Sequence, residues 1–195
     1  MTSPDSLRAK ILASMNRAPA AAPCTFADII AVLERDDIPI VDRDPERQTV
    51  KVRYEDEDAK VEVYVRLVDS DHGQVITMGQ AAFATFPVRN FGDAARLAAL
   101  ANKELAEGKE ELCADFEADF SDARSIYSSV SVGVSGVDFG DGGTFSIGVQ
   151  GSLPYRGRES LDGLALLFGT MYGANLVLMD EYEEGHYDRL GGTLN

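Results

Sequence analysis

The sequence predicts an α+β fold, in which a largely antiparallel sheet is covered on one face by helices. Segments that alternate apolar and polar residues stand in groups, rather than each being followed by a helix. Segments with helical spacing of apolar residues precede, separate and follow these groups. The composition is 45% hydrophobic and 26% charged over 195 residues, which suits a chain that buries a core. The expected order of elements is α-β-β-β-α-β-β-(β)-α.

The chain is expected to form one domain with a short appendage at each end. The first twenty residues show helical spacing of apolar side chains, and a stretch rich in proline and alanine follows. We therefore predict an N-terminal helix and linker at 1–24, a single α+β domain at 25–182 and a polar tail at 183–195. The domain begins with a helix over 26–37, for which Thr25 is the expected cap.

The first group of strands begins with a predicted hairpin. Residues 49–56 and 59–69 each alternate apolar with polar or charged side chains, so one face is expected to be buried and the other wet. The acidic residues at 55–58 suit the turn between them. Residues 73–88 then indicate a third, less regular strand that ends near Pro87.

The spacing of apolar residues changes within the stretch from 90 to 120, from helical spacing to alternation. A helix capped by Asn90 or Asp93 is expected to run to about Glu107, with Gly108 as its left-handed C-terminal residue. Alternation over 112–120 then predicts a strand that presents acidic side chains on its outer face. These acidic candidates for a partner surface are Asp115, Glu117 and Asp119.

The second group of strands is expected at 125–136 and 144–151, followed by a closing helix that Ser160 caps. The closing helix contains an uncharged run over 163–179, which is at the lower limit for a membrane span. Its glycines and its acidic flanks favour a buried helix and no membrane insertion. Small residues four positions apart form a smooth stripe suited to close approach of a sheet or of another helix, namely Ala165, Gly169 and Gly173.

The net charge of −15 sets limits on partners and on location. Nucleic acids and anionic membrane surfaces would be repelled, whereas cations and basic partners would be attracted. Cys24 and Cys113 are far apart and form no metal-binding pair, so we expect reduced thiols and a cytoplasmic protein.

From about Val50 to Asp180 the chain resembles the YbjN-like bacterial domain, which shares its fold with the chaperones of type III secretion systems. The resemblance is carried by the order of elements, by the stretch 94–116 with its central Asn102, and by the leucine-rich helix at 160–179. It implies a small acidic protein, often dimeric, that binds other proteins or acts in regulation. The N-terminal helix and the strand at 144–151 depart from the family pattern.

No catalytic motif accompanies these elements. His72 and His186 fall in a predicted turn and in the tail, where converging metal ligands are not expected. The sequence therefore favours a non-enzymatic cytoplasmic module that binds a protein or peptide on a sheet platform with an acidic surface, without cofactor or metal, and that forms a homodimer. The alternative is a small-molecule or metal-binding domain, or an enzyme of another type, for which a deep apolar pocket with convergent polar groups would be the sign.

Overall fold

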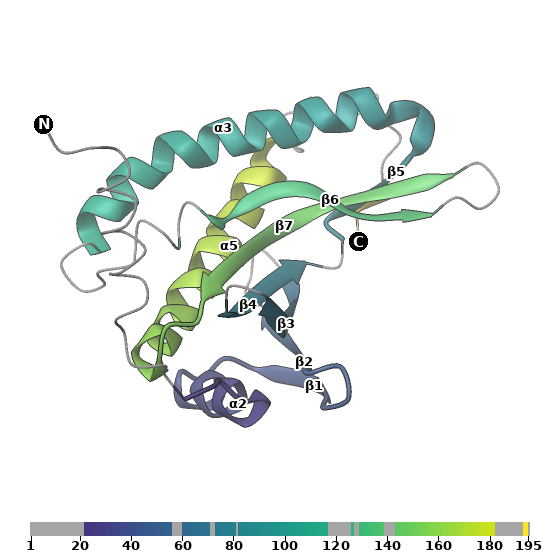
Figure 1. Cartoon of the computed structure of the whole chain (residues 1–195). Helices are drawn as coiled ribbons and strands as arrows, with labels where there is room; N and C mark the ends of the chain where they lie inside the picture. The colour runs from purple at the N-terminus through teal and green to yellow at the C-terminus, as the bar shows by residue number, and fades with distance from the viewer. Residues whose placement is uncertain are drawn as a thin grey trace, which may run out of the picture.

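The computed structural model describes residues 22–55, 60–70, 73–80, 82–116, 126, 129–138, 143–181 and 193–194. Its described part is an α+β fold with one mostly antiparallel sheet and helices against it, as the sequence predicts (Figure 1). The α-helices are α2 (Phe26–Arg35), α3 (Phe91–Phe116) and α5 (Gly163–Glu181), with short 3-10 helices η1 (Val88–Asn90) and η2 (Arg158–Asp162). The strands are β1 (Ile40–Asp44), β2 (Thr49–Glu55), β3 (Lys60–Ser70), β4 (Gly73–Gln80), β5 (Ala84–Pro87), β6 (Ser131–Asp138), β7 (Thr144–Pro154) and β8 (Thr193–Leu194).

Strand β7 is the central strand of the sheet because it pairs with three others. Strand β6 pairs with β7 from Thr144 to Gln150 and occupies one edge of β7. Strands β4 and β5 pair with its two halves and must share the other edge. The expected strand at 73–88 is therefore two strands along the same edge of β7, of which β4 ends at Gln80 and β5 begins at Ala84. From β4 the sheet continues outward through β3, β2 and β1.

The two faces of the sheet differ as period two requires. The valines of β2 and β3 that point one way are fully or almost fully buried, with Val50, Val52 and Val63 at 0% exposure. Helices α3 and α5 lie over this face in Figure 1, with α5 against β7 and α3 against β6. The opposite face, which carries the charged and polar side chains of β2 and β3, is left open by the described helices.

The first helix confirms the predicted cap. The side chain of Thr25 accepts a hydrogen bond from the backbone N–H of Asp28, and the Asp28 carboxylate accepts from the backbone N–H of Thr25 at 2.9 Å. This is a capping box, which satisfies two donors at the helix start. Cys24, which the sequence places in the linker, is 3% exposed and belongs to the core, so the folded part begins before Thr25.

The predicted break at Gly108 is wrong, because α3 continues through Gly108 and Lys109 to Phe116. The alternation over 112–116 therefore belongs to a helix, and the remainder of the expected strand, 117–120, lies outside the described residues. Glycine costs a helix only about 1 kcal/mol, and the surrounding lysine, glutamate, leucine and alanine are good helix formers. Five alternating residues are too few to distinguish the two periods.

Three smaller predictions also need correction. Ile126 and Ser129 are helical, so β6 begins at Ser131 rather than at 125. Ser160 lies within η2, and its hydroxyl donates to the backbone oxygen of Gly157 at 2.6 Å instead of capping α5. In the expected polar tail, β8 pairs with β5.

Candidate functional site

The outer edge of β6 is sealed at one point by a side chain of α3. The amide of Asn102 accepts from the backbone N–H of Val132 at 2.8 Å and donates to the backbone oxygen of Val132 at 2.9 Å. An amide side chain thus takes the place of a neighbouring strand. Because both backbone groups of Val132 turn toward Asn102, they point away from β7.

Beyond this point the same edge is open in the described part of the molecule. Backbone groups two residues apart on a strand point the same way, so those of Val134 also face away from β7. Strand β6 pairs only with β7 among the described strands, and no described side chain bonds to the backbone of Val134. The pairing is irregular just after Val134, and such bulges twist an edge and often mark binding sites.

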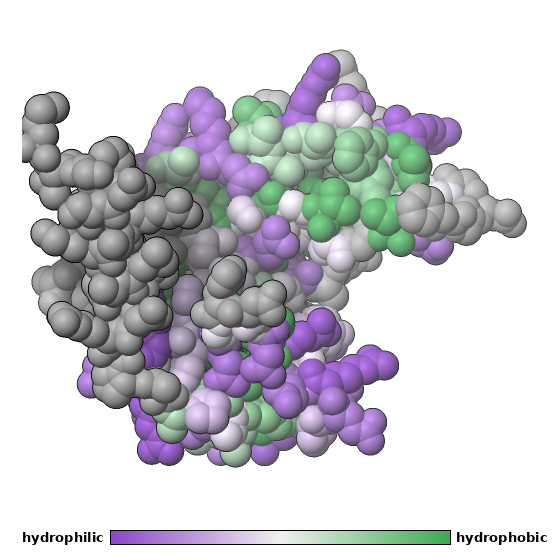
Figure 2. All heavy atoms as spheres, in the orientation of Figure 1, coloured by the Kyte–Doolittle hydropathy of each residue, from purple (hydrophilic) through white to green (hydrophobic). Residues whose placement is uncertain are grey.

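Exposed apolar side chains gather beside this open edge. Val134 and Val137 are 46% and 51% exposed, and Phe91 at the start of α3 is 52% exposed. Phe91 also packs edge-on against Phe145 of β7, with ring centres 5.3 Å apart. Green surface collects where α3 and the β6–β7 hairpin meet in Figure 2. Scattered apolar residues are normal on a surface, but a contiguous patch indicates a binding site.

A groove of about 280 Å³ lies between α3 and these strands. Its helix wall is made of alanines and of Phe91, and its strand wall includes Val134, Phe145 and Ile147. Small alanine side chains keep the helix wall smooth, and Asn102 closes the end where the helix meets β6. We call this feature the α3–β6 groove; it comprises the space between α3 and the exposed edge of β6.

Charges near the α3–β6 groove are few and mixed in sign. Asp93 and Arg96 on α3 approach each other to 3.7 Å, with both side chains more than half exposed. Surface pairs of this kind contribute little to stability and are screened by salt. The groove is therefore an apolar site on a chain that is acidic elsewhere.

Of the predicted acidic surface, the structure describes the backbone of Asp115 alone. Asp115 lies in α3, whereas Glu117 and Asp119 are outside the described residues. Where the outer face of the sheet is described, cations are prominent. Lys51 and Arg53 both bind Glu62. The hydrogen bond from Lys51 makes the larger contribution to lowering the pKa of the Glu62 carboxyl, and that from Arg53 makes the next.

The predicted small-residue stripe on α5 is open. Ala165 and Gly169 are exposed and Gly173 is partly so. A Cβ atom built at Gly169 or Gly173 would meet no described atom within 4 Å. The stripe therefore does not serve close packing on the sheet within the described chain, and the bulky side of α5 does that instead, with Leu164 and Met171 buried.

Cys24 is an inert thiol. It is buried beneath the start of α2, and burial, with a smaller contribution from the nearby Asp28 carboxylate, raises its pKa to about 11. A thiol with a raised pKa is protonated at neutral pH and is a poor nucleophile and ligand. The side chain of Cys113 is outside the described part of the chain.

The described residues contain no group of three or more histidine, cysteine or acidic side chains placed to hold a metal ion. His72 and His186 fall outside the described ranges. By length and composition alone, the helical stretch Arg158–Asp180 is apolar enough to cross a membrane, and 56% of its apolar window is buried inside the protein. Core helices of soluble proteins satisfy the same criterion.

Sequence reasoning identified Asn102 as the central residue of its helix but not what it binds. Its partner Val132 is thirty residues away, and nothing local connects the two. Alternation over 125–136 places Val132 and Val134 on one face of the strand, but Val132 is 5% exposed and Val134 is 46% exposed. No protein-family model, curated protein or solved structure matches this chain. The likeness to the YbjN-like domain therefore stays a prediction.

Proposed function

We propose that this protein is a non-enzymatic binding module that captures an extended segment of a protein partner in the α3–β6 groove. The observation that carries the proposal is the coincidence of a strand edge without a described partner strand and an exposed apolar cluster, at Val134 and Val137 of β6 and Phe91 of α3. An unpaired edge offers backbone hydrogen bonds, and a neighbouring groove selects side chains. Together these are the requirements for recognition by strand addition.

An extended segment suits this site better than a helix would. The backbone groups of Val134 face the open side and lack a described partner, and an added strand supplies the matching donors and acceptors. Its side chains would alternate, with one set entering the groove against Phe91 and Val137. The expected ligand is therefore a strand with apolar residues at every second position. Cytoplasmic location and chaperone-like or regulatory action are part of the same proposal.

The net charge favours a basic or neutral partner. At −15, the chain attracts cationic segments over long range and repels acidic ones. The mixed charges beside the groove, such as Asp93 with Arg96, add little to affinity. We therefore expect salt to slow association while leaving the dissociation rate nearly unchanged.

The test is selection of peptides from a random library displayed on phage, followed by binding measurements with synthetic copies. Selected peptides should alternate apolar residues and should bind the wild-type protein. Val137→Lys places a charge opposite Phe145, which lines the groove, and should abolish binding. Val68→Lys is the matched control, because Val68 is also an exposed strand valine, at 38%, but lies on β3 away from the groove.

The two variants separate the proposal from general loss of structure. Both should keep the melting temperature of the wild type, since neither residue is buried. Equal binding to Val137→Lys and wild type would show that the groove is not the site. Enrichment of peptides without alternation would refute the strand mode.

A further inference from the structure

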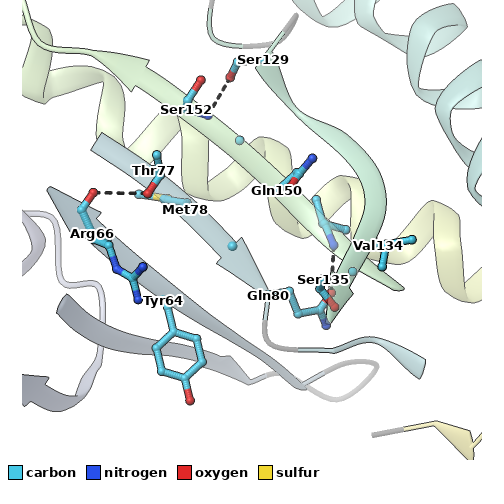
Figure 3. Close-up of a pocket in the computed structure, with 14 residues that line it drawn as sticks. Tyr64, Arg66, Thr77, Met78, Gln80, Ser129, Val134, Ser135, Gln150 and Ser152 are labelled. Carbon is cyan, nitrogen blue, oxygen red and sulfur yellow. Dashed lines mark hydrogen bonds between the residues drawn. The ribbon is translucent and has the colours of Figure 1, made fainter. Parts of the chain in front are cut away.

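A second hollow lies on the open face of the sheet, on the side away from the helices. It has a volume of about 530 Å³ and spans β3, β4, β7 and β6 (Figure 3). This size is in the range of small-molecule sites. We call it the polar trough. The residues that line it include Tyr64 and Arg66 of β3, Thr77 and Gly79 of β4, and Gln150 and Ser152 of β7.

The trough exists because a glycine interrupts a row of side chains. In the register of the sheet, Gly79 stands between Tyr64 and Gln150. A Cβ atom at Gly79 would meet no described atom within 4 Å. The ring of Tyr64 and the amide of Gln150 thus flank an empty position on the sheet surface.

The next row is made of polar groups around one cation. Register places Thr77 between Arg66 and Ser152. Figure 3 shows Arg66 and Tyr64 on one side of the trough and Gln150 and Ser152 on the other. Among the described residues that line the trough, Arg66 is the one charged side chain.

Arg66 has donors to spare. Its Nε donates to the hydroxyl of Thr49 at 3.2 Å. Within the described part of the chain no carboxylate lies within 4 Å of its guanidinium, in contrast to Arg53, which binds Glu62. The terminal nitrogens of an arginine form a planar fork that matches a carboxylate or a phosphate. In a chain of net charge −15, a cation in a hollow without a described carboxylate partner indicates a place for an anion from outside the chain.

We propose that the polar trough binds a small organic anion, with a carboxylate or phosphate group on Arg66 and the body of the ligand over Gly79 between Tyr64 and Gln150. The hydroxyls of Thr77 and Ser152 and the amide of Gln150 supply hydrogen bonds to the polar atoms of the ligand. The ring of Tyr64 provides the apolar wall. The argued contacts lie on the face of the sheet away from the α3–β6 groove, although Val134 at the edge of β6 lines both hollows.

The test titrates the purified full chain with acetate, benzoate, inorganic phosphate and phenyl phosphate, by calorimetry and thermal shift. The set pairs the two anion classes with and without a ring, and uncharged benzamide is the blank. Saturable binding of benzoate or phenyl phosphate, without binding of benzamide, is expected. A response to one class alone identifies the source of the anion.

Three variants locate the binding. Arg66→Gln should weaken it by about tenfold or more, because a charge-assisted fork is lost. Gly79→Val fills the trough at a position with free space and should abolish it. Arg53→Gln removes the same charge from the same face outside the trough and should change affinity by no more than about twofold. Absence of binding by all four anions, or equal affinity in wild type and Arg66→Gln, would overturn the proposal.

Discussion

The outer edge of β6 has two halves that the fold treats in opposite ways. At Val132 the backbone is closed by the amide of Asn102, and the valine is 5% exposed. At Val134 and Val137, a few residues further on, the side chains are about half exposed and only β7 pairs with the described strand. The strand composition is similar in both halves, so the difference lies in the helix, which supplies an asparagine to one half and alanines to the other.

The two halves of the β6 edge differ in how they are protected against association with another strand. Proteins usually protect sheet edges with charges, prolines, bulges or a covering element, because an unpaired edge invites association. Asn102 is such a cover, and the bulge after Val134 is a partial one. The exposed valines at the open half, Val134 and Val137, give no such protection, because apolar side chains favour association. An apolar edge next to a groove fits the binding surface that we propose.

The largest loss of stability is expected when the side chain of Asn102, which covers the edge of β6, is removed. Asn102→Ala leaves the N–H and the carbonyl of the buried Val132 without partners, which should lower the free energy of unfolding by about 2–4 kcal/mol. Lys103→Ala, on the exposed side of the same helix turn, is the control and should cost less than about 0.5 kcal/mol. Urea denaturation measures both. Equal costs for the two variants would mean that the edge at Val132 is not sealed by this contact.

The next largest effect is expected from the buried thiol of Cys24, which should make stability depend on pH in the alkaline range. The raised pKa of Cys24, about 11 against 9.0, means that the unfolded thiol ionises first as pH rises. The stabilisation is fully present below pH 9 and is lost by about pH 11, and it amounts to roughly 2–3 kcal/mol. The measurement is wild-type unfolding free energy minus that of Cys24→Ala between pH 8 and 11. A constant difference would show that the thiol is not buried.

The two faces of the sheet provide a matched pair of glycines. A Cβ atom at Gly151 would lie 2.7 Å from a methyl of Leu167 on α5, so Gly151→Val should cost about 1–3 kcal/mol by overpacking. Gly79→Val faces free space and should be neutral or slightly stabilising, since valine favours strands. Thermal unfolding compares them. A large loss for Gly79→Val would mean that the polar trough is not open.

The smallest effect on stability is expected on the small-residue stripe of α5. Gly169→Leu meets no described neighbour, so the unfolding free energy should change by less than about 0.5 kcal/mol. If the homodimer expected from the sequence packs through this stripe, the bulky side chain should separate the two copies. Light scattering should give a dimer for wild type and a monomer for the variant. A monomeric wild type, or an unchanged dimeric mass, would rule out this interface.

The sequence was most informative where local patterns and packing agree. The hairpin of β2 and β3, the capped helix α2 and the bulky face of α5 follow from periodicity and from Thr25. Strand β1 was not predicted; Pro39 and Pro45 flank it, and prolines in these positions leave its pairing with β2 intact. The break between β4 and β5 depends on the shared edge of β7, which no local pattern encodes.

The candidate sites were harder to predict, because they arise from contacts distant in sequence. Period two correctly put Tyr64 and Arg66 on the wet face, but the trough needs the register that aligns Gly79 between neighbouring strands. Hydrophobic alternation does not separate Val134 from Val132 on the same strand face, although their exposures are 46% and 5%. A valine pattern therefore cannot distinguish a core position from a binding edge.

Amide hydrogen exchange along β6 tests the binding edge most directly. In the free protein the amide of Val132 should exchange slowly, because Asn102 accepts its hydrogen bond, while that of Val134 should exchange fast. A peptide selected on the wild-type protein should slow exchange at Val134 and leave Val132 as it was. If the Val134 amide is already protected in the free protein, or stays fast with the peptide bound, the edge is not the site of strand addition.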